Sequence, residues 1–71
     1  MKITFIGGGN MAQAIIGGLA KQGFAASGCT AVEPLAETRA RLTTLGARAV
    51  ASVAEALPLG DVVVKIGRAH V

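Results

Sequence analysis

The fold is decided by the stretch Lys2-Ile3-Thr4-Phe5-Ile6-Gly7-Gly8-Gly9-Asn10-Met11-Ala12 near the start of the chain. Its first half is a short apolar run, as expected of a strand that is buried on both faces of a parallel sheet. Three glycines then separate this run from a helical pattern. The stretch therefore predicts a strand that turns through glycines into a helix. An anion is expected at the helix N-terminus, where backbone N–H groups lack acceptors and the dipole is positive.

The spacing of small residues in the turn is typical of dinucleotide binding. Gly7 permits a tight turn, Gly9 lets bare backbone approach a pyrophosphate, and Ala12 lets the helix pack closely on the strand. Asn10 and Met11 are candidates for contact with the pyrophosphate or the nicotinamide side, although Asn is also an ordinary residue at helix N-termini. The pattern alone is weak evidence, but here it follows a strand, opens a helix and lies within a βαβ unit.

An acidic residue follows at the expected distance. Glu33 lies about 20 residues beyond the glycine pattern, where a ribose-binding carboxylate belongs. It would accept hydrogen bonds from both ribose hydroxyls and repel a 2′-phosphate, which favours NAD, although Arg39 or Arg41 could still reach a 2′-phosphate of NADP. The other interpretation of Glu33 is a solvent-exposed carboxylate at a strand end. The candidate cofactor-binding residues are Gly7, Gly8, Gly9, Asn10, Met11, Ala12 and Glu33.

The first helix is expected to run from the turn to about Gln22 and to cover the sheet. Gly17 and Gly18 each cost roughly 1 kcal/mol in a helix relative to Ala, so they predict close backbone contact. Gly23 is well placed as the C-cap. The apolar residues expected on one face of this helix are Met11, Ile15, Ile16 and Leu19.

Three further strands are expected at residues 30–33, 47–51 and 61–64. A helix over residues 36–45 carries Ala40, Leu42 and Leu45, and a brief helix through Leu57 begins at Ser52, with Glu55 completing a capping box. The resulting order is β-α-β-α-β-α-β. It predicts an α/β fold, a truncated Rossmann-type parallel sheet with right-handed crossovers.

Composition excludes several functional classes. Seventy-one residues form one small domain at most, with a marginal core. The net charge of +3 says little about binding partners. Without the last seven residues the chain has five basic and four acidic side chains, a net charge of +1. The absence of Trp and Tyr disfavours proteins that read nucleic acids by aromatic stacking.

The chain contains a single cysteine, Cys29, and one long uncharged stretch. One cysteine excludes an intrachain disulfide and fits a reduced cytoplasm, with the thiol as a small apolar or loop residue. The stretch from Ile3 to Ala20 contains five glycines with Asn10 and Gln13. These residues divide it into two short apolar groups, so neither a signal peptide nor a membrane span is indicated.

The sequence resembles the N-terminal portion of pyrroline-5-carboxylate reductases. The string Phe5-Ile6-Gly7-Gly8-Gly9-Asn10-Met11-Ala12, continued by Ala14-Ile15-Ile16-Gly17-Gly18-Leu19, carries the resemblance. Further matches follow in order at Val32-Glu33-Pro34, Arg39, Leu42, Gly46, Glu55-Ala56 and Asp61-Val62-Val63-Val64. The Gly-Asn-Met step followed by Ile-Gly-Gly-Leu is more specific than a generic dinucleotide fingerprint. The resemblance covers residues 1–64, the N-terminal part of a dinucleotide-binding domain.

The resemblance implies an oxidoreductase that transfers hydride from NAD(P)H to the C=N bond of 1-pyrroline-5-carboxylate, the last step of proline biosynthesis. In that family the substrate pocket and the dimer belong largely to a helical C-terminal domain outside this chain. We therefore assign no catalytic residue and no metal ligand, and expect the chain alone to be inactive. The alternatives are a deazaflavin-dependent NADP oxidoreductase, a β-hydroxyacid dehydrogenase and a non-enzymatic nucleotide-sensing domain.

The chain departs from the family after Val64. Where those reductases continue through Ala-Val-Lys-Pro, this sequence reads Lys65-Ile66-Gly67-Arg68-Ala69-His70-Val71. Ile-Gly-Arg-Ala-His-Val is what a common sequencing adapter encodes in one reading frame. We therefore expect residues 65–71 to be a non-native tail, and His70 is not a candidate base or ligand.

Overall fold

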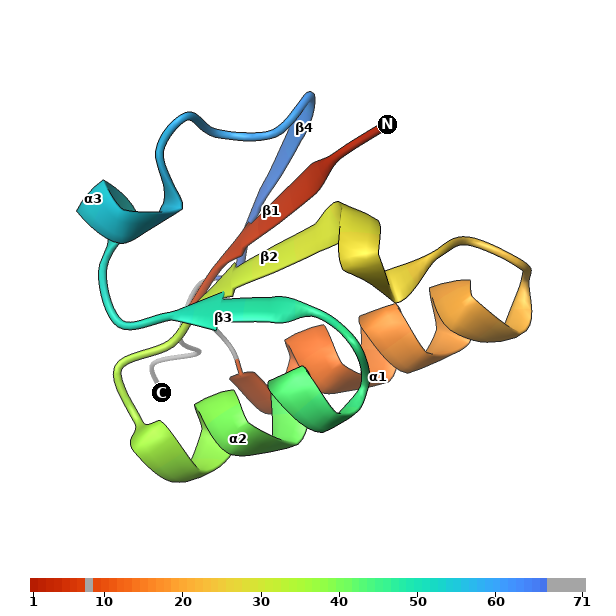
Figure 1. Ribbon diagram of the computed structural model, residues 1–71, viewed down its shortest axis with the longest axis horizontal. Coiled ribbons are helices and arrows are strands. Elements are labelled where there is room, and N and C mark those ends of the chain that lie inside the picture. Colours follow the sequence, from red (N-terminus) through yellow and green to blue (C-terminus); the bar gives the residue numbers. More distant parts are fainter. Residues whose placement is uncertain (8, 67–71) are drawn as a thin grey trace, which may run out of the picture.

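The computed structural model describes residues 1–7 and 9–66 (Figure 1). The expectations for Gly8 and for residues 67–71 of the tail lie outside these residues. The elements in chain order are β1 (Ile3–Ile6), α1 (Gly9–Lys21), a 3₁₀ helix (Ala26–Gly28), β2 (Cys29–Val32), α2 (Ala36–Thr44), β3 (Arg48–Val50), α3 (Val53–Ala56) and β4 (Val62–Lys65). The predicted alternation of strands and helices is confirmed, with the ends of elements shifted by one or two residues.

The four strands form one parallel sheet in the order β3-β2-β1-β4. In this sheet β1 is central, since Ile3 is in register with Cys29 of β2 on one side and with Val62 of β4 on the other. The chain adds β2 and β3 on one side of β1 and then crosses to add β4 on the other (Figure 1). The predicted Rossmann-type α/β fold is therefore confirmed. The change of direction beside β1 is the place where such sheets bind ligands, at the carboxyl ends of the strands.

The helices divide between the two faces of the sheet. α1 and α2 contact each other, whereas α3 lies apart from them beside β2 and β3 (Figure 1). Side chains alternate along a strand, so Thr4 and Thr30 point away from the face that carries Phe5 and Ala31. Thr4 and Thr30 line a pocket together with Ala56 of α3. Helices α1 and α2 thus cover one face, and the short helix α3 covers part of the other.

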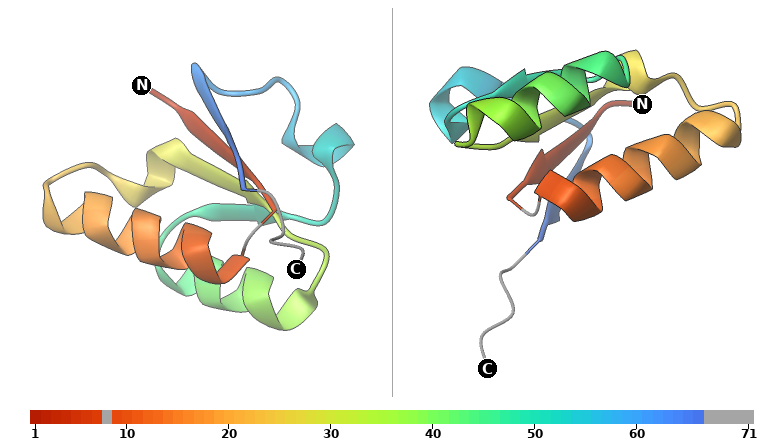
Figure 2. Two further views of the ribbon diagram at one scale, coloured as in Figure 1. Left: turned by 180° about the vertical axis from the view of Figure 1, so that it is seen from behind. Right: turned by 90° about the horizontal axis from the view of Figure 1, so that it is seen from below.

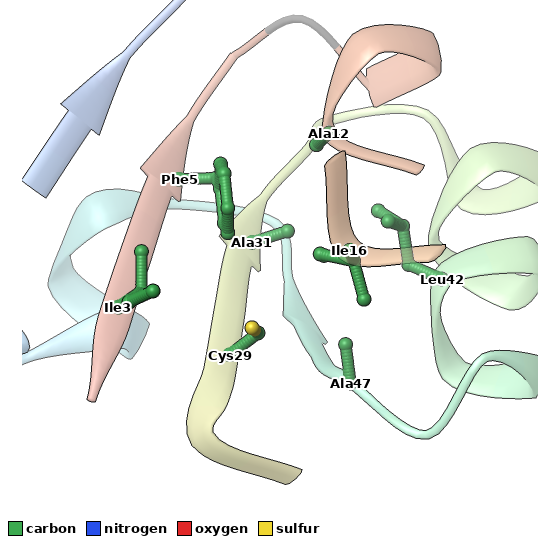
Figure 3. Packing of buried hydrophobic residues seen from close by; sticks show 8 residues of the cluster. All are labelled: Ile3, Phe5, Ala12, Ile16, Cys29, Ala31, Leu42 and Ala47. Carbon is green, nitrogen blue, oxygen red and sulfur yellow. The ribbon is translucent and has the colours of Figure 1, made fainter. Parts of the chain in front are cut away.

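The hydrophobic core fills the space between the sheet and helices α1 and α2 (Figure 3). Its largest fully buried apolar side chains are Phe5 of β1, Ile16 of α1 and Leu42 of α2, and burying each contributes about 1.5–3 kcal/mol. The other members of the cluster are Ile3, Ala12, Cys29, Ala31 and Ala47. Most of these are small, which allows the helices to approach the sheet closely.

The prediction of which α1 residues pack against the sheet is partly wrong. Met11 and Ile15 are 57% and 36% exposed, whereas the buried residues of α1 are Gly9, Ala12 and Ile16. These three residues recur at spacings of three and four, as one helical face requires. Small side chains occupy the contact because they let the helix backbone come close to the strands, and the larger Met11 and Ile15 lie outside it.

The predicted close contact at Gly17 and Gly18 is also wrong. A Cβ built on either residue meets no atom of the described chain within 4 Å. Gly23, in contrast, has a φ of +91° and donates its N–H to the Ala20 carbonyl at 3.1 Å. Gly23 therefore ends α1 as predicted, because only glycine adopts this conformation without strain.

The two shorter helices follow the expected pattern in part. In α2 Leu42 is fully buried, whereas Ala40 and Leu45 are exposed. At the start of α3 a Glu55 carboxylate oxygen accepts the backbone N–H of Ser52 at 3.0 Å. The capping box expected from Ser52 and Glu55 is thereby confirmed.

Candidate functional site

The candidate site lies where β1 ends and α1 begins. The Gly7 N–H donates to the carbonyl of Val32, the last residue of β2, at 3.1 Å. The Ile66 N–H donates to the carbonyl of Ile6, the last residue of β1, at 3.0 Å. Both views of Figure 2 show the ends of β1 and β4 close to the start of α1, and we call this region the corner. The structure therefore brings three strand ends and one helix N-terminus together.

Gly7 is required here for two separate reasons. Its φ of +82° is a left-handed conformation that other residues adopt only with strain. A Cβ on Gly7 would also lie 3.0 Å from the carbonyl oxygen of Ile66. A side chain at this position would therefore strain the backbone and crowd the end of β4, so Gly7 sets the tight turn that the sequence pattern predicts.

Gly9 opens α1 and is buried. A Cβ on this residue would overlap the Thr38 methyl group and would lie 2.5 Å from Glu33 Oε1. The sequence pattern predicts that the missing side chain of Gly9 lets the backbone approach a pyrophosphate. In the structure the missing side chain also lets the start of α1 come close to Glu33 and to helix α2.

The other members of the glycine motif differ in exposure. Ala12 is fully buried and is part of the core, which fits its expected role in packing the helix on the strand. Asn10 is exposed, and its Oδ1 accepts a hydrogen bond from Gln13 Nε2 at 3.4 Å. Met11 is exposed as well. Asn10 and Met11 are thus accessible to a ligand at the helix N-terminus.

The electrostatics of this corner suit an anion. The first turn of α1 consists of four uncharged residues, Gly9, Asn10, Met11 and Ala12. Its first N–H groups have no acceptor within the helix. A helix of 13 residues adds a partial positive charge at this end. An anionic group placed here would be stabilised by backbone donors and needs no cationic side chain.

Glu33 follows β2 directly and is only 7% exposed. Its Oε1 faces Gly9, as the Cβ test shows, and its Oε2 accepts the backbone N–H of Leu35 at 3.0 Å. Its own backbone N–H donates to the Val50 carbonyl at 2.8 Å. Glu33 is therefore an ordered carboxylate beside the glycine turn, and the interpretation as a solvent-exposed strand end is wrong.

The two arginines considered for a 2′-phosphate occupy different positions. Arg39 Nη1 donates to the carbonyl oxygens of both Glu33 and Pro34 at 2.8 Å. Arg41 pairs with Glu37 on the exposed side of α2, with 2.9 Å between Arg41 Nη2 and Glu37 Oε1. The structure thus brings Arg39, but not Arg41, to the turn that carries Glu33. This role of Arg39 needs a side chain that folds back from α2 onto the preceding turn, which no local sequence pattern reveals.

Cys29 lies away from this corner, at the start of β2. It is fully buried and belongs to the core cluster (Figure 3). Burial raises the pKa of the Cys29 thiol above its ordinary value of 9.0, because the charged thiolate loses its hydration. The expectation of a small apolar residue is confirmed, and a reactive thiolate is disfavoured.

A pocket of about 260 Å³ lies at the opposite end of the sheet, on the face of α3. Two basic residues, Lys2 and Arg48, line it together with hydroxyl groups. Thr4 is one of these and is already engaged, since its Oγ1 accepts the N–H of Gly60 at 2.8 Å. The pocket lining includes neither the glycine turn nor Glu33, so it is separate from the candidate site.

Within residues 1–7 and 9–66 no helix has the length and apolar character needed to cross a membrane. In the same part of the chain, His, Cys, Asp and Glu side chains do not gather in groups of three or more that could hold a metal ion.

Comparison with known proteins yields consistent relatives. Residues 2–66 match a family model described as NADP oxidoreductase, coenzyme F420-dependent. A pyrroline-5-carboxylate reductase of Pseudomonas aeruginosa is 47% identical over 64 residues, which cover 89% of this chain and 23% of the relative. One of Pasteurella multocida is 54% identical over 48 residues, covering 68% of this chain and 18% of the relative. One of Haemophilus influenzae is 56% identical over 43 residues, covering 61% and 16%.

These matches define what the chain is similar to. The resemblance to pyrroline-5-carboxylate reductases is confirmed by three curated relatives that carry this name. The chain spans about a fifth of the length of these relatives. No solved structure matches it. Because the family model covers nearly the whole chain, the chain belongs to the family described as NADP oxidoreductase, coenzyme F420-dependent.

Proposed function

We propose that the chain is the N-terminal, cofactor-binding portion of a pyrroline-5-carboxylate reductase and that it binds NAD(P)H. The observation that carries this proposal is the position of Glu33, a buried carboxylate directly beside Gly9 at the start of α1. Under this proposal, the backbone N–H groups that would donate to the pyrophosphate lie next to the carboxylate that would accept hydrogen bonds from the ribose. This is the arrangement that a dinucleotide needs, and the names of the relatives support it.

The residues present fit the ADP-ribose half of the cofactor. The N–H groups of Gly9, Asn10 and Met11 would hold the pyrophosphate, since they open α1 and carry no negative side chain. Gly7 keeps the turn tight, and Glu33 would accept the ribose hydroxyls. When bound, the cofactor would supply a hydride for the reduction. The residues of this chain would bind and orient the cofactor. Gly8 completes the motif.

The substrate of the complete enzyme is proposed from the same relatives. A pyrroline-5-carboxylate reductase reduces the C=N bond of 1-pyrroline-5-carboxylate to give L-proline. We place the substrate-binding and catalytic residues, as well as the subunit contacts of a homo-oligomer, in the part of such a reductase that residues 1–64 do not match. The buried, reduced Cys29 suits a cytoplasmic enzyme.

Cofactor binding is tested by titrating the chain with NADH and NADPH in a calorimeter. We expect binding with one site per chain, and loss of most of the affinity in the variant Gly7→Val. Gly17→Ala is the matched control, because a Cβ at Gly17 meets open space among the described residues. If a chain with a well-dispersed amide NMR spectrum binds neither nucleotide, the proposed function is wrong.

The substrate is tested separately with the complete reading frame that encodes these residues. Oxidation of NAD(P)H in the presence of 1-pyrroline-5-carboxylate supports the proposal. No turnover with either nucleotide would exclude it. The sequencing of that reading frame also shows whether residues 65–71 are native, because genomic codons for them would refute a tail derived from an adapter.

A second candidate follows from the description of the matching family, which names a coenzyme F420-dependent NADP oxidoreductase. In that case hydride would pass between NADP and a deazaflavin, and the glycine turn would have the same role. Turnover with a deazaflavin but not with 1-pyrroline-5-carboxylate would favour this candidate. Nucleotide binding without turnover of either substrate would favour a nucleotide-sensing domain.

A further inference from the structure

The turn between β2 and α2 is held by one side chain that comes from the first turns of α2. Arg39 Nη1 donates to the carbonyl of Glu33 and to the carbonyl of Pro34, both at 2.8 Å. Two successive carbonyls therefore share one cationic donor. Hydrogen bonds from a charged donor are among the stronger ones in proteins. The backbone at residues 33–34 is thus fixed relative to α2.

The same turn fixes the direction of the Glu33 side chain. Glu33 Oε2 accepts the N–H of Leu35 at 3.0 Å, a bond within the same turn that Arg39 contacts. Oε1 faces Gly9 at the start of α1. The carboxylate is therefore held between the turn and the helix N-terminus, and its 7% exposure leaves it little freedom to move.

We infer that Arg39 is a positioning residue that pins the β2–α2 turn, so that Glu33 stays against Gly9 and selects NAD(H) over NADP(H). This inference rests on the proposed function. With Glu33 fixed there, its negative charge meets the 2′ position of the adenosine ribose. A 2′-hydroxyl donates a hydrogen bond to the carboxylate, whereas a 2′-phosphate is repelled by it.

An opposite role for Arg39 is a direct contact with a 2′-phosphate. The geometry favours positioning, because Nη1 is already directed at two backbone carbonyls. Arg41, the other arginine of α2, pairs with Glu37 with 2.9 Å between Nη2 and Oε1, at side-chain exposures of 55% and 81%. The two roles of Arg39 predict opposite changes in nucleotide preference, so one substitution separates them.

The experiment compares Arg39→Gln, Arg39→Lys and the control Arg41→Gln in calorimetric titrations with NADH and with NADPH. For Arg39→Gln we expect NADH affinity to fall about tenfold, because the carboxylate is no longer preorganised. NADPH affinity changes less than about twofold, since relaxing the turn also relieves the repulsion. Arg39→Lys should keep part of the NADH affinity that Arg39→Gln loses. Arg41→Gln should change the affinity for neither nucleotide. A selective loss of NADPH affinity in Arg39→Gln would overturn the inference.

A double-substitution cycle shows whether Arg39 acts through Glu33. If it does, Arg39→Gln adds almost nothing to the loss of NADH affinity already caused by Glu33→Gln. Independent, multiplying losses would contradict the inference. In the free chain, Arg39→Gln should also speed hydrogen exchange of the Leu35 amide, because that N–H loses its fixed acceptor. Failure of the unchanged chain to bind either nucleotide refutes the proposed function, which is a distinct result.

Discussion

Both ends of the sheet contain a glycine that lies very close to neighbouring atoms, but the close approach has a different purpose at each end. At the amino end, Gly60 approaches β1 so closely that a Cβ would lie 2.5 Å from the Lys2 carbonyl oxygen and 2.8 Å from its carbon. There the Gly60 N–H donates to Thr4 Oγ1, and the Lys2 N–H donates to Asp61 Oδ2 at 2.9 Å. At the carboxyl end, the close approach of Gly7 and Gly9 lies beside a helix N-terminus and a buried carboxylate.

A glycine at a close approach therefore does not by itself indicate a ligand site. Around Gly60 the neighbouring polar groups bond to one another, so the bare backbone serves packing. Around Gly9 the first N–H groups of α1 lack acceptors within the helix and can serve a ligand. The neighbours of a glycine, and not the glycine, decide which purpose it serves.

The largest expected effect is at the amino end. Gly60→Ala places a Cβ against backbone atoms of Lys2, which cannot move without displacing β1. We expect a loss of about 3 kcal/mol in the free energy of unfolding, measured by urea denaturation. The ratio of NADH to NADPH affinity should not change in the molecules that remain folded. A variant as stable as the original chain would show that this end is not closed by packing.

The carboxyl end should lose function before stability. In Gly9→Ala the new Cβ meets the Thr38 methyl group and the Glu33 carboxylate, which are side-chain atoms and yield more readily than the Lys2 backbone that Gly60 approaches. We expect a loss of about 1–2 kcal/mol in stability, and a fall of about tenfold in NADH affinity because the carboxylate is displaced. Gly18→Ala, in the same helix, is the control. Unchanged affinity in Gly9→Ala would remove the functional distinction between the ends.

Substitution of a glycine that lies at neither end of the sheet should have the opposite effect on stability. Gly17 lies inside α1, and a Cβ there meets open space among the described residues. Gly17→Ala is therefore expected to stabilise the chain by about 1 kcal/mol through helix propensity. Thermal denaturation followed by circular dichroism measures this change. Destabilisation would mean that Gly17 makes a contact that the described residues do not supply.

The smallest expected effect is a pH dependence of stability that comes from Cys29, in the core between the two ends of the sheet. Burial raises the pKa of the Cys29 thiol above 9.0 in the folded chain. As pH rises past the ordinary pKa, the unfolded chain loses this proton first and so binds fewer protons. Stability therefore falls with pH above about 9. Denaturation at pH 7 and pH 10 should show a smaller fall in Cys29→Ala than in the original chain. Equal falls in both would contradict this contribution.

The element order was predictable because each strand and helix is marked by local chemistry. The apolar run before Gly7, the capping residues Ser52 and Glu55, and the helix-ending Gly23 act within a few residues of their own position. The structure confirms each of these features. Local signals of this kind depend little on the rest of the chain.

The contacts between elements were harder to predict. Periodicity placed Met11 and Ile15 against the sheet because they are large and apolar, whereas close packing required Gly9 and Ala12 there. The contact of Gly60 with Lys2 joins residues that only the fold brings together, and the contacts of Arg39 depend on the direction of one long side chain. At the site, the position of Glu33 was predictable from spacing, but its burial was not. Burial depends on how the surrounding elements pack, which spacing along the chain does not reveal.

The strand order also bears on how the chain acquires its structure during synthesis. Every member of the buried core cluster lies between Ile3 and Ala47, so a ribosome has already made that cluster before it reaches β4, whose Val64 then packs against it. The pairing of Ile3 with Val62, in contrast, must wait for the far end of the chain. Contacts between residues so distant in sequence form slowly. The corner proposed as the nucleotide site, where the end of β4 meets β1, is thus completed last.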